Sequence, residues 1–183
     1  DRLSNGLAKS LINLGIKTGD KVAILLENTP DFVVTYFAII KAGAIAIPLD
    51  TKYKLLELQA VFNDCFPKAL VAEASILKII GSELPRFASI VNVISMGDDA
   101  TGYCSYLSLL NACETAPQVN EYPELAHIAY TSGPTLRPHG AEITQAGLIN
   151  AAEGSAAGFG QSEQDTVVLF ALPLHHTMGI AII

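Results

Sequence analysis

The sequence predicts an α/β fold in which repeated βα units form a mainly parallel sheet flanked by helices. Short apolar segments suited to buried strands alternate with segments whose apolar residues recur every three or four positions, as they do in helices. Half of the 183 residues are hydrophobic and only 16% are charged, so the chain can bury a sizeable core. No internal repeat or low-complexity segment interrupts the alternation.

Apolar spacing marks the first two helices and the strand between them. Leucines at intervals of three or four over residues 3–14 predict an opening helix that Gly15 ends. The apolar run at residues 21–26 predicts a buried strand. A second helix is predicted to begin at Thr29-Pro30, because a hydroxyl residue followed by proline suits a helix start, and to end near Gly43.

The same alternation continues beyond this helix. Residues 44–48 are too few and too β-branched for a helix, and they predict a second strand. Helical spacing over residues 55–62 predicts the next helix. Further strands are predicted over residues 69–72 and 90–94, with Pro85 breaking the helical pattern between them.

A linker is predicted over residues 117–125. This segment contains Pro117 and Pro123, is otherwise mainly polar, and shows neither helical nor strand periodicity. It is expected to separate a first βα sub-region, residues 1–116, from the start of a second one, residues 126–183.

The second sub-region contains the most informative segment of the chain. A buried strand is predicted over residues 127–130, followed by a turn at residues 131–140, a helix at about 144–159 and a strand at 166–172. The turn is rich in hydroxyl and glycine residues. Between a strand and a helix, such a turn allows backbone N–H groups to gather around an anion. We call residues 131–140 the signature segment, and we expect it to bind phosphate.

The composition argues against several classes of function. A formal net charge of −7 without clusters of Lys and Arg argues against nucleic acid as a partner. The apolar runs are shorter than the roughly 18 to 20 residues that a transmembrane helix needs. The chain opens at Asp1 without a signal segment and stops inside an apolar run, so we expect a cytoplasmic protein that is cut at both ends.

The three cysteines predict neither a disulfide framework nor a zinc site. Cys65, Cys104 and Cys113 are odd in number, lack CxxC spacing and have no histidine pair nearby. We expect them to be buried, inert thiols in a reducing compartment. No carboxylate of the chain can be assigned to a metal ion.

The signature segment resembles that of the adenylate-forming superfamily, which includes acyl-CoA synthetases, firefly luciferase and the adenylation domains of peptide synthetases. The usual form is Thr-Ser-Gly-Thr-Thr-Gly-x-Pro-Lys-Gly, followed shortly by Thr-His. The positions that agree are Thr131, Ser132, Gly133, Thr135, Pro138, Gly140 and Thr144, and those that depart are Pro134, Leu136, His139 and Gln145. Residues 28–32, 41–50 and 172–179 are also similar to family segments, in the family's order.

The resemblance implies a partial amino-terminal domain of an ATP-dependent enzyme that activates carboxylates. Such an enzyme joins a carboxylic acid to ATP with Mg²⁺, and then passes the acyl group to a thiol, commonly that of CoA. An acyl-CoA ligase of fatty acid metabolism is the first expectation. The alternatives are a non-catalytic descendant that serves as a scaffold or binding module, and a peptide-synthetase adenylation domain. The family's later elements lie outside these 183 residues, so no complete catalytic set is expected and the fragment is predicted to be inactive.

The resemblance also implies roles for individual residues. Those expected to contact the ATP phosphates are Thr131, Ser132, Gly133, Thr135, His139, Gly140 and Thr144. Those expected to line the acyl pocket are His176 and Gly179. Two alternatives stay open, because Thr144 can instead be the N-cap of the next helix and His175, which replaces the usual phenylalanine, can lie in the pocket wall or at the surface.

Three departures are expected to weaken ATP binding. Pro134 has no N–H to donate, and the Cβ of Leu136 crowds a backbone that must approach phosphate closely. His139 is shorter than the usual lysine and is mostly neutral at pH 7. Each loss should cost about 1 to 3 kcal/mol where the lost contact is a hydrogen bond to a charged group. Arg137 could compensate, although the family's variable position usually points away.

Overall fold

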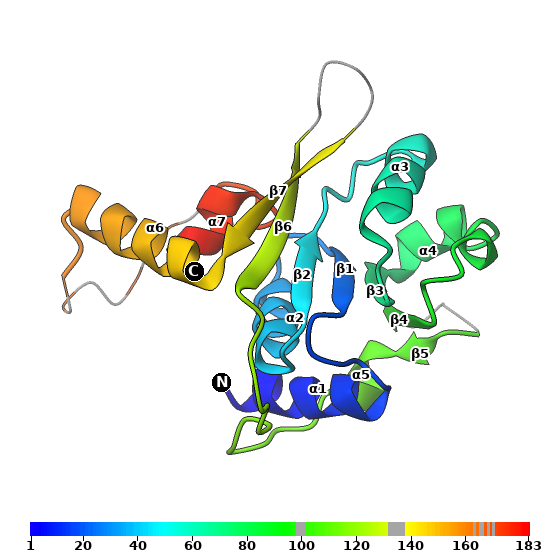
Figure 1. Cartoon of the computed structure of the whole chain (residues 1–183), viewed down its shortest axis with the longest axis horizontal. Coiled ribbons are helices and arrows are strands. Elements are labelled where there is room, and N and C mark those ends of the chain that lie inside the picture. Colours follow the sequence, from blue (N-terminus) through cyan, green and yellow to red (C-terminus); the bar gives the residue numbers. More distant parts are fainter. Residues whose placement is uncertain (98–101, 132–137, 163, 165–166, 168, 170) are drawn as a thin grey trace.

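A seven-stranded sheet with helices on both faces forms the molecule (Figure 1). The computed structural model describes the chain except residues 98–101, 132–137, 163, 165–166, 168 and 170. The strands are β1 (Lys21–Leu25), β2 (Ile45–Pro48), β3 (Ala69–Glu73), β4 (Asn92–Met96), β5 (Cys104–Ser105), β6 (Leu125–Thr131) and β7 (His139–Thr144). The helices are α1 (Arg2–Asn13), α2 (Pro30–Lys41), α3 (Leu55–Cys65), α4 (Ala74–Ile80), the 3-10 turn η1 (Leu84–Arg86), α5 (Tyr106–Leu109), α6 (Gln145–Gly158) and α7 (Thr177–Ile182).

The sheet is parallel except at one edge. Its strand order is β5-β4-β3-β1-β2-β6-β7, and each neighbouring pair is parallel apart from β6 and β7, which are antiparallel. We call this last pair the β6–β7 ribbon. The predicted fold class, a mainly parallel sheet flanked by helices, is confirmed. The carboxyl ends of β1, β2 and β6 therefore meet at one edge, where open α/β sheets usually bind ligands.

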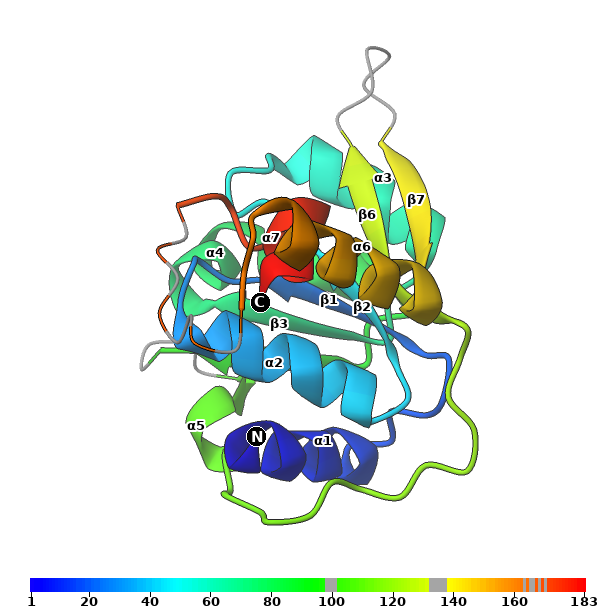
Figure 2. The same ribbon diagram turned by 90° about the vertical axis from the view of Figure 1, so that its left-hand side faces the viewer.

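Helices cover both faces of the central strands. Side chains alternate along a strand, so Val22 and Ile24 of β1 pack in one core with α1, α2 and α5, whereas Ala23 and Leu25 pack in the other with α3 and α4. Burial on both faces explains why the strands are continuous apolar runs without polar alternation. Figure 2 shows α2 lying along the sheet, with α1 beneath it.

The predicted boundaries of α2 are confirmed. Pro30 lies in its first turn and Asp31 adds a carboxylate there, which suits the positive end of the helix dipole. Gly43 follows the helix with a φ of 75°, a backbone conformation that residues other than glycine rarely adopt. The chain can therefore turn at once into β2.

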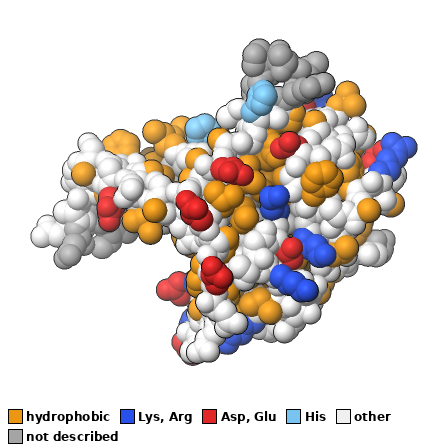
Figure 3. Space-filling view, in the orientation of Figure 1, with side chains coloured by type: hydrophobic (Ala, Val, Ile, Leu, Met, Phe, Trp, Pro, Cys, Tyr) orange, Lys and Arg blue, Asp and Glu red, His pale blue; other side chains and the backbone are white. Residues whose placement is uncertain are grey.

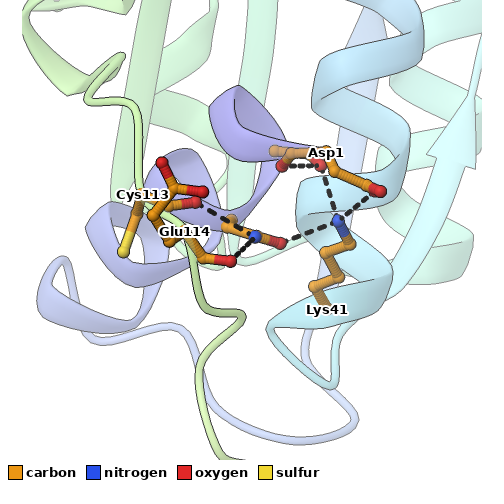
Figure 4. A network of polar contacts seen from close by, with 6 residues as sticks. Asp1, Lys41, Cys113 and Glu114 are labelled. Atoms are coloured by element: carbon orange, nitrogen blue, oxygen red, sulfur yellow. Dashed lines mark hydrogen bonds and ion pairs between the residues drawn. The ribbon is translucent and has the colours of Figure 1, made fainter.

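A polar network fastens α1 to α2 and to the segment that follows α5 (Figure 4). Lys41 Nζ donates to Asp1 Oδ1 at 3.1 Å and to Asn5 Oδ1 at 2.8 Å. Asn5 Nδ2 in turn donates to the backbone oxygens of Cys113 and Glu114 at 3.1 and 3.2 Å. One buried asparagine thus joins three segments that are far apart in the sequence.

The carboxy-terminal third differs from the sequence-based expectation. The predicted strand-loop-helix order is wrong, because residues 139–144 form β7 and pair with β6 before α6 begins. The predicted strand over residues 166–172 is not found in the part of that segment that the structure describes. Val167 and Leu169 are exposed and lie in no strand, whereas residues 166, 168 and 170 lie outside the described residues.

The predicted linker lies between strands of one sheet. Residues 110–124 contain no helix or strand, and the strands before and after them join the same sheet. The division into residues 1–116 and 126–183 therefore stays a prediction. Among the helices that the structure describes, none is long and apolar enough to cross a lipid bilayer.

Of the three thiols that are expected to be buried and inert, only Cys65 is buried. Cys104 and Cys113 are half-buried. Lys9 Nζ lies 2.9 Å from Cys113 Sγ, and this hydrogen bond lowers the pKa of the Cys113 thiol. The spacing of the cysteines does not reveal this lysine on α1. Its proximity makes the Cys113 thiol more acidic than an isolated thiol.

Candidate functional site

A hollow of about 250 Å³ lies at the carboxyl ends of β2 and β6. We call it the Thr131 hollow. It is lined by Asp50, Tyr53, Ala129, Tyr130, Thr131, His175, His176 and Thr177. The residues come from the turn after β2, the end of β6 and the start of α7, so the sheet edge and one helix build it together.

A second hollow of about 230 Å³ lies at the carboxyl end of β1 and shares two residues with the first. We call it the Asn28 hollow. Its lining includes Glu27, Asn28 and Lys52, and it shares Asp50 and His175 with the Thr131 hollow. The shared pair stands at the junction of the two hollows.

The signature segment is only partly described by the structure. Residues 132–137 lie outside the described residues, and they include the predicted phosphate contacts Ser132, Gly133 and Thr135. Thr131 and His139 pair across the end of the β6–β7 ribbon, and both are exposed. The structure thus brings these two predicted residues together, with Thr131 at the wall of the Thr131 hollow.

Gly140 has a packing role in the ribbon. It lies in β7, and a Cβ at this position would approach Ile128 Cγ2 to 2.8 Å and the ring of Tyr130 to 3.1 Å. The predicted turn geometry at Gly140 is therefore wrong, since the residue is in a strand. The absence of a side chain gives room to its cross-strand neighbours.

Thr144 lies far along the ribbon from Thr131 and His139. It pairs with Leu125, at the opposite end from Thr131 and His139. Five residue-to-residue steps along the strand separate it from His139, or about 17 Å at ~3.3 Å per step. Its Oγ1 accepts a hydrogen bond from Gly147 N at 3.0 Å. The N-cap alternative for Thr144 is confirmed.

Asn28 positions the two neighbouring histidines of the site. Its Nδ2 donates to Leu172 O at 2.9 Å, and its Oδ1 accepts from Leu174 N at 2.8 Å. These two bonds hold the chain just before His175 against the end of β1. His176 follows as the N-cap of α7, where its Nδ1 lies 3.4 Å from Met178 N. Both histidines line the Thr131 hollow, so His175 lies in the wall of this hollow.

Gly179 supports these histidines without lining either hollow. It is buried in α7, and a Cβ there would lie 2.4 Å from the backbone oxygen of Pro173. Glycine is needed because the helix packs directly on the turn before it. Gly179 thus has a packing role, and its place in an acyl pocket stays a prediction.

Sequence reasoning missed Asp50, Tyr53 and Thr177. Asp50 directly follows a strand that ends at the ligand-binding edge of the sheet, and this position could have identified it. Tyr53 Oη donates to Tyr130 O at 3.4 Å, which is a contact between distant segments. Local sequence patterns give no signal for such a contact.

The Asp50 and His175 side chains face each other across 3.8 Å, measured from Oδ2 to Nε2. Partial burial lowers the pKa of His175, and the nearby Asp50 carboxylate acts in the opposite direction. His175 is therefore mostly neutral at pH 7. A neutral imidazole and a carboxylate at this junction favour ligand groups that donate hydrogen bonds.

Replacing Asp50 with Asn should lower the pKa of His175 further, because the carboxylate that favours the imidazolium is lost. The measurement is a pH titration of the His175 ring protons by nuclear magnetic resonance. Asp20→Asn is the matched control, since Asp20 precedes β1, at the opposite edge of the sheet, and lines neither hollow. An unchanged or raised His175 pKa in Asp50→Asn would show that the two side chains do not interact.

Acidic side chains are prominent around the ribbon on the face shown in Figure 3. A smaller hollow of about 120 Å³ there is lined in part by Lys21, Asp64 and Glu142. In the described part of the chain, no group of three His, Cys, Asp or Glu side chains is arranged to hold a metal ion. The described residues thus supply hydroxyl and imidazole groups to the site, and no preformed metal centre.

Comparison with known proteins places these features in a family context. The family model for AMP-binding enzymes matches residues 1–183. Phosphinothricin tripeptide synthetase PhsC of Streptomyces viridochromogenes is 31% identical over 175 residues, which cover 94% of this chain and 15% of that protein.

Two solved structures share the fold over nearly the whole chain. A putative long-chain-fatty-acid CoA ligase from Rhodopseudomonas palustris has a TM-score of 0.85 and 28% identity, covering 98% of this chain and 45% of that one. ATP-bound MatB from the same organism has a TM-score of 0.82 and 28% identity, covering 99% of this chain and 35% of that one. The chain thus spans less than half the length of each relative.

Proposed function

The chain belongs to the AMP-binding enzyme family, and we propose that it is the amino-terminal part of an enzyme that uses ATP to activate a carboxylic acid. The observation that carries the proposal is the position of the Thr131 hollow. It opens at the carboxyl ends of β2 and β6, where Thr131 of the signature segment and residues 175–177 line it. Both segments resemble those of adenylate-forming enzymes, and the fold matches an ATP-bound member of known structure.

The proposed reaction has two steps. A carboxylate oxygen attacks the α-phosphorus of ATP, and the bond to the β-phosphate oxygen breaks to release pyrophosphate. A thiol then attacks the acyl carbon of the adenylate, and AMP leaves as the thioester forms. Negative charge grows on the phosphate oxygens in the first step, so donors fixed before the reaction lower its barrier.

Residues of the signature segment are proposed to hold the phosphates of ATP. The Thr131 hydroxyl lies at the hollow, and Ser132, Gly133 and Thr135 follow it in the sequence. His139 pairs with Thr131 and can donate from its ring. Hydroxyls and an imidazole bind phosphate more weakly than the lysine that is usual in the family. Mg²⁺ is proposed to bind together with ATP, because the described residues form no metal centre.

An acyl-CoA ligase is the preferred form of this function. The Pro173-Leu174-x-His176 sequence followed by Met178-Gly179 suits these ligases, and a CoA ligase shares the fold at a TM-score of 0.85. CoA as acceptor, fatty acids as substrates and a cytoplasmic location belong to this proposal. A peptide-synthetase adenylation domain is the alternative, supported by the 31% identity to a tripeptide synthetase.

A second candidate function is that of a non-catalytic descendant acting as a scaffold or binding module. It is favoured by the three departures Pro134, Leu136 and His139. The first removes an N–H donor, the second adds a Cβ that crowds the backbone, and the third replaces the usual lysine. In either case the 183-residue chain itself is proposed to be inactive. Pyrophosphate exchange with a panel of carboxylic acids should remain at background, and exchange by this chain would contradict its inactivity.

Substitution of Thr131 by Val should lower the affinity for ATP by about tenfold, because a hydroxyl donor to a charged phosphate is lost while the side-chain shape is kept. An ATP titration followed by nuclear magnetic resonance measures this at millimolar concentrations. Thr18→Val, at an exposed position after α1, is the matched control and should bind like the natural chain. If the natural chain does not bind ATP at millimolar concentrations, the scaffold function is favoured. Equal affinity in both variants would remove Thr131 from the site.

A further inference from the structure

A buried histidine lies where the β6–β7 ribbon joins the parallel sheet. His127 of β6 is completely inaccessible to solvent, and its Nδ1 lies 3.0 Å from the hydroxyl of Tyr36 on α2. The two rings meet edge to face, with centroids 5.9 Å apart. Among the described residues, Nε2 of His127 has no hydrogen-bond partner. One ring nitrogen of this buried imidazole thus has a hydrogen-bond partner, and the other has none.

His127 lies at the backbone pairing between β6 and the parallel sheet. Ala46 and His127 form the one register pair between β2 and β6 in the described residues. By contrast, β1 and β2 share four pairs, and β6 and β7 share six. Backbone pairing thus joins the ribbon to the parallel sheet at His127, and Ile128 and Tyr130 of β6 add side-chain packing on the α3 side.

Among the described residues, no charged side chain is paired with His127. Ala46 of β2 and Ile143 of β7 are its strand neighbours. Tyr36 is the titratable group in contact from α2, and burial raises its pKa well above the ordinary range. In α6 the titratable side chain is the exposed Glu153, and α7 has none. A proton on His127 would therefore create a buried charge without a counterion.

We propose that the His127–Tyr36 contact is an acid-sensitive joint, which holds the β6–β7 ribbon to the parallel sheet while the imidazole is neutral and releases it when the ring gains a proton. A neutral ring shares one hydrogen bond with Tyr36 and leaves one nitrogen unpaired. An imidazolium has two N–H donors and a full charge, and the described residues around Nε2 offer it no acceptor. Opening the joint places the charged ring in solvent.

The direction of the pH effect follows from burial. Burial lowers the pKa of His127 from 6.5 to about 4 in the closed joint, whereas an opened joint exposes the ring to solvent and restores the ordinary value. The open state thus binds more protons between these values. Stability of the joint is complete above pH 6.5 and is lost as the pH falls toward 4. The equilibrium constant for opening should rise roughly 30-fold between pH 7.5 and pH 5.

The opening should be local to the ribbon. Helix α6, which follows the ribbon, has no buried residue and adds little to hold it in place. Strands β1 and β3, by contrast, are buried on both faces and paired on both sides. Because β6 ends at Thr131, release of the ribbon would also displace the signature segment. This consequence for the ATP site rests on the proposed function, but the joint itself does not.

Amide hydrogen exchange of the whole chain at pH 7.5 and pH 5, corrected for the intrinsic effect of pH, tests the proposal. Protection of residues 126–129 should fall roughly 30-fold relative to the change at Ile24 and Val71. In the His127→Gln variant, which keeps a neutral polar group, the difference between the two pH values should disappear. A ring-proton titration of the natural chain should place the pKa of His127 near 4.

Several outcomes would overturn the inference. One is unchanged protection of residues 126–129 at pH 5. Another is an equal loss of protection in β1 and β3, which would indicate global unfolding. A third is the same pH dependence in His127→Gln, which would assign the effect to another group. Where His127→Gln does not fold, the His127 titration and the regional exchange of the natural chain decide the question. None of these readouts requires ATP, so failure here leaves the proposed function untouched.

Discussion

Combining Pro134→Thr, Leu136→Gly and His139→Lys in one variant should raise the affinity of this chain for ATP by about 100-fold or more. The first substitution would restore a backbone N–H, and the second would remove a Cβ from the path of the phosphate. The third would add a full positive charge next to Thr131. Each contact is worth about 1 to 3 kcal/mol, and 100-fold corresponds to ~2.7 kcal/mol.

Titration calorimetry with ATP measures the gain directly. Adding Thr131→Val to the triple variant should remove part of it, since both changes act at the same end of the ribbon. A control variant with His139→Lys alone separates the general effect of added charge from the shape of the segment. If the triple variant binds ATP no better than the natural chain, the three departures do not explain weak binding, and the phosphate role of the signature segment is wrong.

Substitution of Gly6 by Ala should destabilise the fold by about 4 kcal/mol, because a Cβ at this position has no space. It would lie 1.3 Å from the backbone oxygen of Asn111 and 2.5 Å from its carbonyl carbon. Neither atom belongs to a flexible side chain, so residues 111–114 or α1 must move. That movement breaks the bonds of Asn5 to Cys113 and Glu114.

Urea unfolding of both variants provides the test, with Gly154→Ala as the matched control. Gly154 is also in a helix, but no atom lies within 4 Å of the position its Cβ would take. The control should therefore be neutral or more stable by up to about 1 kcal/mol, from helix propensity alone. A similar effect of both substitutions would show that segment 111–114 is not packed on α1 as the structure describes.

Local sequence signals suffice to predict the order of elements in the first hundred residues. The leucine spacing of α1, the Thr29-Pro30 start of α2 and the apolar runs of β1, β2 and β3 are local signals, and the structure confirms them. The family was identified from motif residues in a fixed order, which the family match over residues 1–183 bears out. These features can be predicted because periodicity and motifs are patterns among residues that are close together in the sequence.

The arrangement around the site depends on how distant elements pack together. Residues 139–144 become a strand because the edge of β6 offers a partner. This pairing places Thr144 at the opposite end of the ribbon from Thr131 and His139. The approach of Asp50 to His175, and of Lys9 to Cys113, joins residues more than a hundred positions apart. Such contacts depend on the packing of complete elements, and no local pattern of residues encodes them.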